Sequence, residues 1–242
     1  MADLPDLERL PTYSSIDPLH PTINTNHDRD LTVTFSNLSP TASHTYEIHT
    51  NRTTGGLDIT YGAYQLYHVG RYLQHQTPDI VVYGGYDTHG PQLALARFIQ
   101  DGKNFNIHLG GLKRPVGEDW DIVRCASDGR MFHSTPYYRF EVPATDARSG
   151  ERSKRKLHWK RTHESKLGAS HLSRRDYKLV DESSDEVVAV YTEHSISFEG
   201  KVSYRRKMDD YVEVASLVVL MAILERQRRA FGNMTQVIAG HM

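Results

Sequence analysis

The stretch MDDYVEVASLVVLMAILERQRRA, Met208–Ala230, decides the fold of this chain. Its apolar side chains would cover a helix on every side, with Glu213 and Ser216 as interruptions. A membrane span needs about 20 mostly apolar residues, and the run Val214–Leu224 is roughly half as long. A helix lying in a membrane interface would need one polar face. We therefore expect a helix that is enclosed by protein on all sides.

The ends of this helix can also be predicted from the sequence. Asp209 and Asp210 stand where carboxylates accept hydrogen bonds from free amide groups, and Asp210 with Glu213 approximates a capping box. The arginines of LERQRR match the negative pole at the other end, and Gly232 fits the C′ position. Burying about nine large apolar side chains of this helix contributes roughly 13 to 27 kcal/mol before opposing costs.

Upstream of the helix the chain has the pattern of short strands. Runs rich in Val, Ile, Tyr, Phe and Thr, many with alternating polarity, are separated by Gly, Pro, Asn or Asp. The runs are LTVTFSN, HTYEIHT, LDITYG, YQLYHVG, DIVVYGG, QLALARFI, NFNIHLG, DWDIVRCA, YYRFEV, KLHWKRT, DYKLVDE, VVAVYTE and KVSYRR. Such strands favour a barrel or a sandwich. Because the helix needs an enclosure, we predict a mainly β (β-rich α+β) fold, a closed antiparallel barrel of about 12 strands around the buried C-terminal helix.

The same patterns set the expected domain limits. Residues 1–28 contain several prolines and many Ser, Thr, Asn and Asp, and they predict an extended N-terminal arm. Residues 29–231 would form the barrel with its central helix, and residues 232–242 a C-terminal tail. Inside the barrel domain, residues 144–176 are rich in Ser, Gly, Arg and Lys, which predicts a basic insertion of loop and strand, with exposed loops on both sides of KLHWKRT.

This basic insertion offers the main candidate binding chemistry. Phosphoryl groups need convergent cationic donors, and Lys156, His158 and Lys160 alternate with Leu157 and Trp159, so a strand here would have one basic, wet face. The candidate anion-binding or lipid-binding residues are Lys154, Arg155, Lys156, Lys160, Arg161, Arg174 and Arg175. Two interpretations stay open. Either these cations form a binding rim with Trp159 at the depth of lipid head groups, or Trp159 packs into the barrel and the charges only solvate a loop.

Composition excludes two classes of protein. A net charge of -1, a pI near 6.9 and 38% hydrophobic residues argue against a disordered chain and against a globally basic nucleic-acid binder. Cys125 has no second cysteine with which to form an internal disulfide, and the first residues lack the pattern of a secretory signal. We expect an intracellular, most simply cytoplasmic, protein without a transmembrane span, which meets a membrane only at its surface.

Catalytic and metal-binding patterns are missing from the sequence. The 14 histidines show neither H-E-x-x-H nor a Cys/His zinc spacing, and neither a nucleophile elbow nor a phosphate-binding loop precedes a helix. Cys125 lies in the alternating run IVRCAS, which is typical of a packed, inert thiol. We expect no enzymatic activity, cofactor or metal, and an enzyme with a site at the barrel mouth is the least favoured alternative.

The order of the last elements resembles a known superfamily. Trp159-Lys-Arg is followed by DYKLVDE, VVAVYTE and the basic strand KVSYRRK, which leads into the apolar helix. Over residues 29–231 this order is similar to the tubby C-terminal-like superfamily, which includes LURP-one-related proteins and phospholipid scramblases, and most of all to a fungal domain of unknown function within it. The resemblance implies a barrel threaded by the helix. Tubby domains bind phosphoinositides through basic side chains, but no such residue pattern matches here position by position.

Together these patterns predict a non-enzymatic intracellular binding module. Its expected ligand is an anionic phospholipid head group or a phosphorylated or acidic protein partner, held by the basic insertion, and nucleic acid is not expected. The alternative is a protein-interaction scaffold that uses the arm, residues 1–28, as a docking segment.

Overall fold

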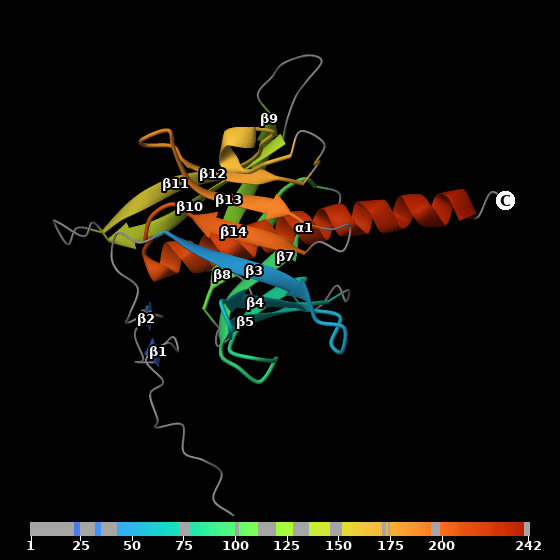
Figure 1. The fold of residues 1–242 in the computed structure, drawn as a ribbon, viewed down its shortest axis with the longest axis horizontal. Helices are drawn as coiled ribbons and strands as arrows, with labels where there is room; N and C mark the ends of the chain where they lie inside the picture. Colours follow the sequence, from blue (N-terminus) through green and yellow to red (C-terminus); the bar gives the residue numbers. More distant parts are fainter. Residues whose placement is uncertain are drawn as a thin grey trace, which may run out of the picture.

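The fold is seen in a computed structural model, in which one C-terminal helix runs through a ring of strands (Figure 1). The structure describes residues 22–24, 32–34, 43–72, 78–99, 102–110, 120–127, 136–145, 152–170, 173, 175–194 and 199–239. The barrel strands are β3 His44–Thr50, β4 Leu57–Tyr61, β5 Tyr64–Arg71, β6 Ile80–Gly84, β7 Gln92–Phe98, β8 Phe105–Leu109, β9 Asp121–Ser127, β10 Pro136–Thr145, β11 Arg152–Arg161, β12 Tyr177–Asp181, β13 Glu186–Glu193 and β14 Gly200–Tyr204. The helices are the 3₁₀ turn η1, Ser165–Leu167, and α1, Asp210–Ala239.

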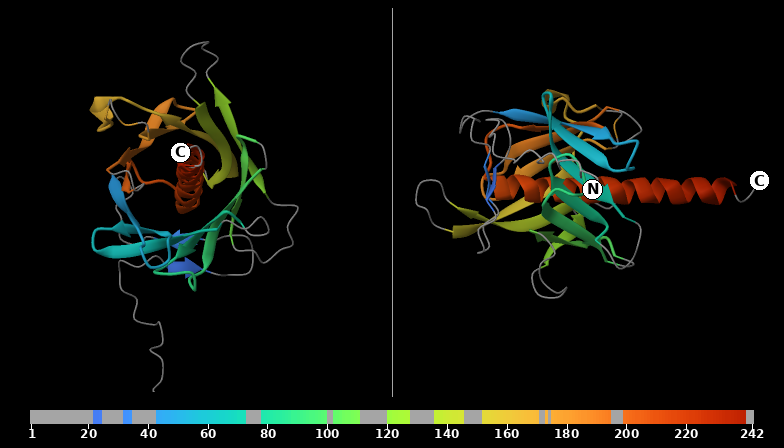
Figure 2. Two further views of the ribbon diagram at one scale, coloured as in Figure 1. Left: turned by 90° about the vertical axis from the view of Figure 1, so that its right-hand side faces the viewer. Right: turned by 90° about the horizontal axis from the view of Figure 1, so that it is seen from below.

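The barrel is closed and antiparallel throughout. Each strand from β3 to β14 pairs with the next one in sequence, and β14 pairs with β3 to complete the ring. This closure leaves no open edge among the twelve strands. The left-hand view of Figure 2 looks along the barrel and shows α1 inside it. The predicted fold, a mainly β closed barrel of about 12 strands around the C-terminal helix, is confirmed.

The apolar run of α1 is the part of the helix that the barrel buries. From Val212 to Leu224 every residue of the helix is at most 5% exposed, and the strands contribute alternate residues such as Tyr46, Ile48 and Val69 to the same core. Trp159 of β11 also lies in this core and donates from its indole Nε1 to the carbonyl oxygen of Ser216 at 2.9 Å. In the described part of the chain, no helix is long and apolar enough to cross a membrane.

The two predicted helix ends need correction. At the start, the Asp209 carboxylate accepts a hydrogen bond from the Tyr211 N–H at 2.9 Å, but the Glu213 carboxylate turns into the barrel instead of completing a capping box. At the other end α1 does not stop at Gly232; it continues to Ala239 and extends out of the barrel (Figure 2). One glycine inside a helix costs only about 1 kcal/mol, and the residues that follow include no proline to end the helix.

The predicted first strand lies outside the barrel. Residues 32–34 of LTVTFSN form β2, Thr32–Thr34, which pairs with β1, Thr22–Asn24, in a separate two-stranded sheet that lies against α1. The barrel therefore begins at His44, not at residue 29, because β14 already occupies the free edge of β3. β1 falls within the predicted arm, whereas residues 1–21 and 25–28 of that arm lie outside the described residues.

The basic insertion, residues 144–176, is largely part of the barrel. Strands β10 and β11 pair along their length from Tyr137 opposite Lys160 to Thr145 opposite Arg152. The expected exposed loop before KLHWKRT is therefore wrong for residues 152–155, where cross-strand hydrogen bonding extends the strand despite its charge. After β11, η1 forms a short turn at Ser165–Leu167.

Candidate functional site

Strand alternation sends the predicted basic residues in different directions. In β11, Lys154 and Lys156 are exposed and Lys160 is half-buried on the outer surface, whereas Leu157 and Trp159 are buried inside the barrel. The prediction of one basic, wet face on this strand is confirmed. Since the indole of Trp159 is fully buried, the interpretation that places it at head-group depth is wrong, and the packed alternative is correct.

Arg155 lies at the end of the barrel where α1 begins, here called the entry end. Its Nε donates to Oδ2 of Asp181 at 2.7 Å, and Arg206 approaches the same oxygen at 3.5 Å. Burial raises the pKa of Asp181, but hydrogen bonds from Ser183 and Arg155 outweigh that effect and leave the pKa lowered. Arg155 is therefore occupied by an internal carboxylate.

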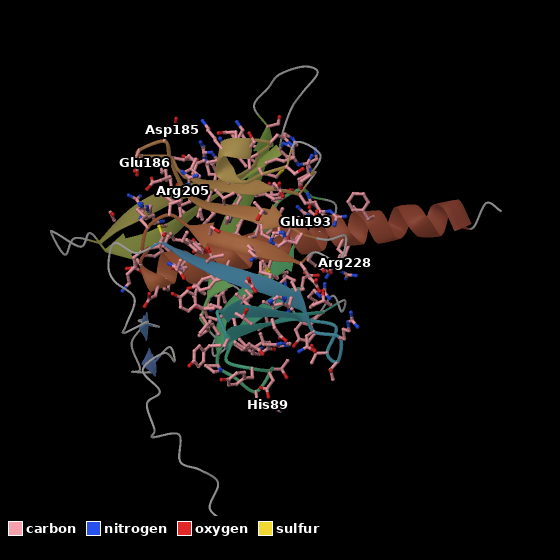
Figure 3. The ribbon with its side chains drawn as sticks, in the orientation of Figure 1. His89, Asp185, Glu186, Glu193, Arg205 and Arg228 are labelled. Carbon is pink, nitrogen blue, oxygen red and sulfur yellow. The ribbon has the colours of Figure 1, made fainter. Side chains whose placement is uncertain are left out.

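Arg161 and Arg175 lie at the opposite end, where α1 leaves the barrel, here called the exit end. Arg161 ends β11 opposite Tyr177, and Arg175 pairs with Glu193 at 2.6 Å and stacks over the ring of Phe231 at 4.9 Å. Figure 3 shows Glu193 near the exit of the helix. The seven predicted residues thus do not converge on one site, and Arg174 lies outside the described residues.

A basic surface does form around Lys160, from strands far apart in the sequence. We define the basic face as Arg124, Arg139, His158, Lys160 and Lys178, which lie on the outer side of β9, β10, β11 and β12. In register, Arg124 stands opposite Arg139, Arg139 opposite His158, and Lys160 opposite Lys178. Like charges directly opposite one another destabilise a sheet.

Two carboxylates partly offset these charges. Glu182 lies 2.5 Å from Nε of Arg139 and 3.3 Å from Nδ1 of His158, and Glu164 lies 2.5 Å from Nζ of Lys178. Among the described residues, Arg124 is exposed and has no ion-pair partner. The exposed guanidinium of Arg124, beside the side chains of Arg139 and Lys160, suits the basic face to an anion.

Burial lowers the pKa of the His158 imidazole, and Glu182 opposes that shift more strongly than the charges of Lys160 and Arg139 reinforce it. The ring of Tyr137 lies 5.5 Å from that of His158 and contributes an aromatic surface beside the cations.

Sequence reasoning missed Arg124, Arg139 and Lys178 as members of one surface with Lys160. Arg124 and Arg139 come from runs with no unusual charge, and only the register of β9 against β10 brings them together. A signal was available in β10, where Arg139 alternates with the apolar Tyr138 and Phe140 and must therefore face outward.

A second missed feature is a pair of buried polar networks at the two ends of the barrel. At the entry end, Glu213 accepts a hydrogen bond from Tyr46 and lies 3.1 Å from Nε2 of His44. At the exit end, Glu225 accepts from Arg228 and Arg229 at 2.7 to 2.8 Å. Arg228 therefore binds a carboxylate of its own helix, whereas Arg226 and Arg229 also reach groups of the barrel, because the helix continues past them.

Within the described residues, no group of three or more His, Cys, Asp or Glu side chains is arranged to hold a metal ion. Cys125 is a free, half-buried thiol in β9 that packs against the core, as its sequence pattern predicts. His44 and Glu213 are both nearly inaccessible to solvent, with side chains 1% and 3% exposed, so a substrate would not reach them in this conformation.

Comparison with known proteins adds little. No protein-family model matches the chain, and no curated protein matches it. A solved structure, the X-ray structure of a protein from Arabidopsis thaliana, is similar with a TM-score of 0.44 and 15% sequence identity, over 76% of this chain and 93% of that one. A similarity of this size assigns neither a family nor a function.

Proposed function

We propose that the protein is a non-enzymatic intracellular binding module that holds a phosphate-bearing ligand on its basic face. The register that opposes Arg124 to Arg139 and Lys160 to Lys178 is the observation that carries this proposal. Opposed like charges cost stability in the free protein, and an anion bridging them would convert that cost into charge-assisted hydrogen bonds. Kinship with the tubby C-terminal-like superfamily is part of the proposal, since a barrel threaded by its last helix is what the resemblance implies.

The face suits a ligand with more than one anionic oxygen. Neighbouring strands lie about 4.8 Å apart, and alternate residues along a strand lie about 6.7 Å apart. The side chains of Arg124, Arg139 and Lys160 are long enough to converge across these spacings on one phosphoryl group. Both a lipid head group and a phosphorylated protein carry this chemistry.

The test is isothermal titration with inositol hexakisphosphate as a soluble phosphate-rich probe. The double variant Arg124→Glu, Lys160→Glu should bind about 100-fold more weakly, because two charge-assisted contacts of about 1.5 kcal/mol each are lost. A matched control, Arg52→Glu with Lys103→Glu, carries the same charge change on exposed cations outside the basic face and should bind within about twofold of the wild type. Equal binding by both variants would reject the basic face.

A further inference from the structure

A groove lies beside the basic face on the outer surface of the barrel. Its volume is about 570 Å³, and it runs between η1, the start of β13 and the segment that follows β14. Figure 3 shows Glu186 and Arg205 on this side of the barrel. The side chains that matter for its chemistry are Glu164, Lys166, Leu167, Glu186, Val187 and Arg205.

The groove combines an apolar wall with charges of both signs. Leu167 and Val187 are half-buried and provide the apolar part. Glu186 pairs with Arg206 at 3.1 Å, and both are substantially exposed. Exposed pairs of this kind contribute little to stability, so either charge is available to a ligand. Among the described residues, the exposed Arg205 has no side-chain partner.

One carboxylate joins the groove to the basic face. Oε1 of Glu164 lies 2.5 Å from Nζ of Lys178 on the basic face, and its Oε2 lies 3.3 Å from Nζ of Lys166 in the groove. A ligand whose phosphoryl group sits on the basic face therefore has the groove immediately alongside.

The chemistry of the groove favours one class of phosphate-bearing ligand over the others. A free phosphate or a lipid head group would gain from cations but not from the apolar side chains Leu167 and Val187. A polypeptide offers amide groups, apolar side chains and charges of both signs, and it matches all three. A site of about 300 to 1,000 Å³ also fits a short segment and not a folded domain.

We propose that the ligand of the basic face is a phosphorylated peptide segment of a partner protein. Its phosphoryl group binds Arg124, Arg139 and Lys160, and the neighbouring residues lie in the groove against Leu167 and Val187. This inference rests on the proposed function and adds the class of partner and a second contact surface to it.

The experiment uses the full chain and a library of 13-residue peptides, each with a central phosphoserine or phosphothreonine between random flanks, and each with an unphosphorylated twin. Fluorescence polarisation should find phosphopeptides that bind at least about tenfold more tightly than their twins. The groove variant Val187→Asp should weaken those peptides about tenfold and leave the affinity for inositol hexakisphosphate unchanged. The control Thr88→Asp, an exposed turn residue between β6 and β7 that does not line the groove, should leave both affinities unchanged.

The possible results separate the two proposals. If phosphopeptides bind no better than their twins while inositol hexakisphosphate or vesicles with phosphoinositides bind the basic face, the peptide inference is wrong and the proposed function stands. If Val187→Asp leaves phosphopeptide affinity unchanged while Arg124→Glu, Lys160→Glu abolishes it, the groove has no role and the inference is again overturned. If none of the probes binds, both proposals fail. A change in the unfolding midpoint of Val187→Asp, followed by circular dichroism, identifies a misfolded variant, for which Leu167→Asp is the substitute.

Discussion

Two buried glutamates of the same helix, Glu213 at the entry end and Glu225 at the exit end, show how differently one fold can accommodate a carboxylate. Both residues are nearly inaccessible, at 2% and 3% exposure. Glu213 accepts from the hydroxyl of Tyr46 and faces His44, while Glu225 receives the guanidinium groups of Arg228 and Arg229. Polar but mostly uncharged groups surround the first, and cations surround the second.

The electrostatic consequence differs at the two ends. Burial raises the pKa of Glu225, but hydrogen bonds from Arg228 and Arg229 outweigh it and leave the pKa lowered. At the entry end, burial and the nearby Glu213 raise the pKa of Asp210 to about 7. The exit end therefore favours the ionised form of Glu225 beside two arginines of its own helix, whereas the entry end holds Asp210 in a site that favours its protonated form.

The exit end is also more extensively connected. Arg229 binds Asp79 at 2.7 Å and the carbonyl of Tyr72 at 2.8 Å, and Arg226 binds the carbonyls of Gly102 at 2.6 Å and Asn104 at 3.1 Å. These bonds join the helix to two connections at the barrel rim, one between β5 and β6 and one between β7 and β8. The charged run LERQRR, which follows the apolar part of α1, therefore has a structural role that could not be predicted from the sequence.

The largest effect is expected from Glu225→Gln. The amide keeps the shape of the side chain but leaves Arg228 without its carboxylate and Arg229 with Asp79 alone, and removal of one partner from a buried ion cluster costs about 3 kcal/mol. Urea unfolding at pH 7 measures the loss of unfolding free energy. The matched substitution Glu213→Gln should cost only about 1 kcal/mol, because its amide oxygen still accepts from Tyr46. Equal losses at both positions would remove the contrast between the two ends.

A smaller effect is expected from Tyr46→Phe at the entry end. This change removes the hydroxyl that donates to Glu213 and leaves a buried acceptor with one partner fewer, at a cost of about 2 kcal/mol. The control is Tyr138→Phe, in which a buried ring of the same barrel loses its hydroxyl away from Glu213. A loss no greater than that of the control would show that the hydrogen bond to Glu213 is unimportant.

The smallest effect is the dependence of stability on pH through Asp210. Its folded-state pKa, about 7, lies above the value of an unfolded chain. The folded state therefore binds the proton more tightly, so this contribution is complete below the unfolded pKa and is lost as pH rises towards about 7. After allowance for solvent screening of this half-exposed group, the unfolding free energy should fall by about 1 kcal/mol from pH 5 to pH 8.

Asp210→Asn should flatten that fall, as measured by urea midpoints at pH 5, 6, 7 and 8. Asp185→Asn, in the exposed turn between β12 and β13, serves as the control and should retain the wild-type slope. If the midpoint of Asp210→Asn changes with pH as steeply as that of the wild type, protonation of Asp210 does not stabilise the folded state. The two ends would then differ only in their ion pairs.

Several features could be predicted because they depend on local pattern. The alternation in KLHWKRT places Trp159 inside and Lys160 outside, and all twelve barrel strands fall on runs that the sequence marks as strands. Two helix-end predictions failed for a physical reason: Glu213 accepts a hydrogen bond from Tyr46 of the barrel, and Arg226 and Arg229 bind groups of the barrel instead of the helix terminus. The prediction that the basic residues form one site was wrong in part. Lys160 lies on the outer face of β11, whereas Arg155 and Arg161 lie on its other face, towards opposite ends of the barrel.

The sequence by itself determined that a helix apolar on all sides must be enclosed and that alternating strands must enclose it, since both periodicities are local properties of the chain. Only the tertiary structure decided which strand stands beside which, and with that the meeting of Arg124, Arg139 and Lys160 on one surface and the partners of Glu213 and Glu225. Register between strands is set by packing of the entire barrel against α1, so no single segment contains it.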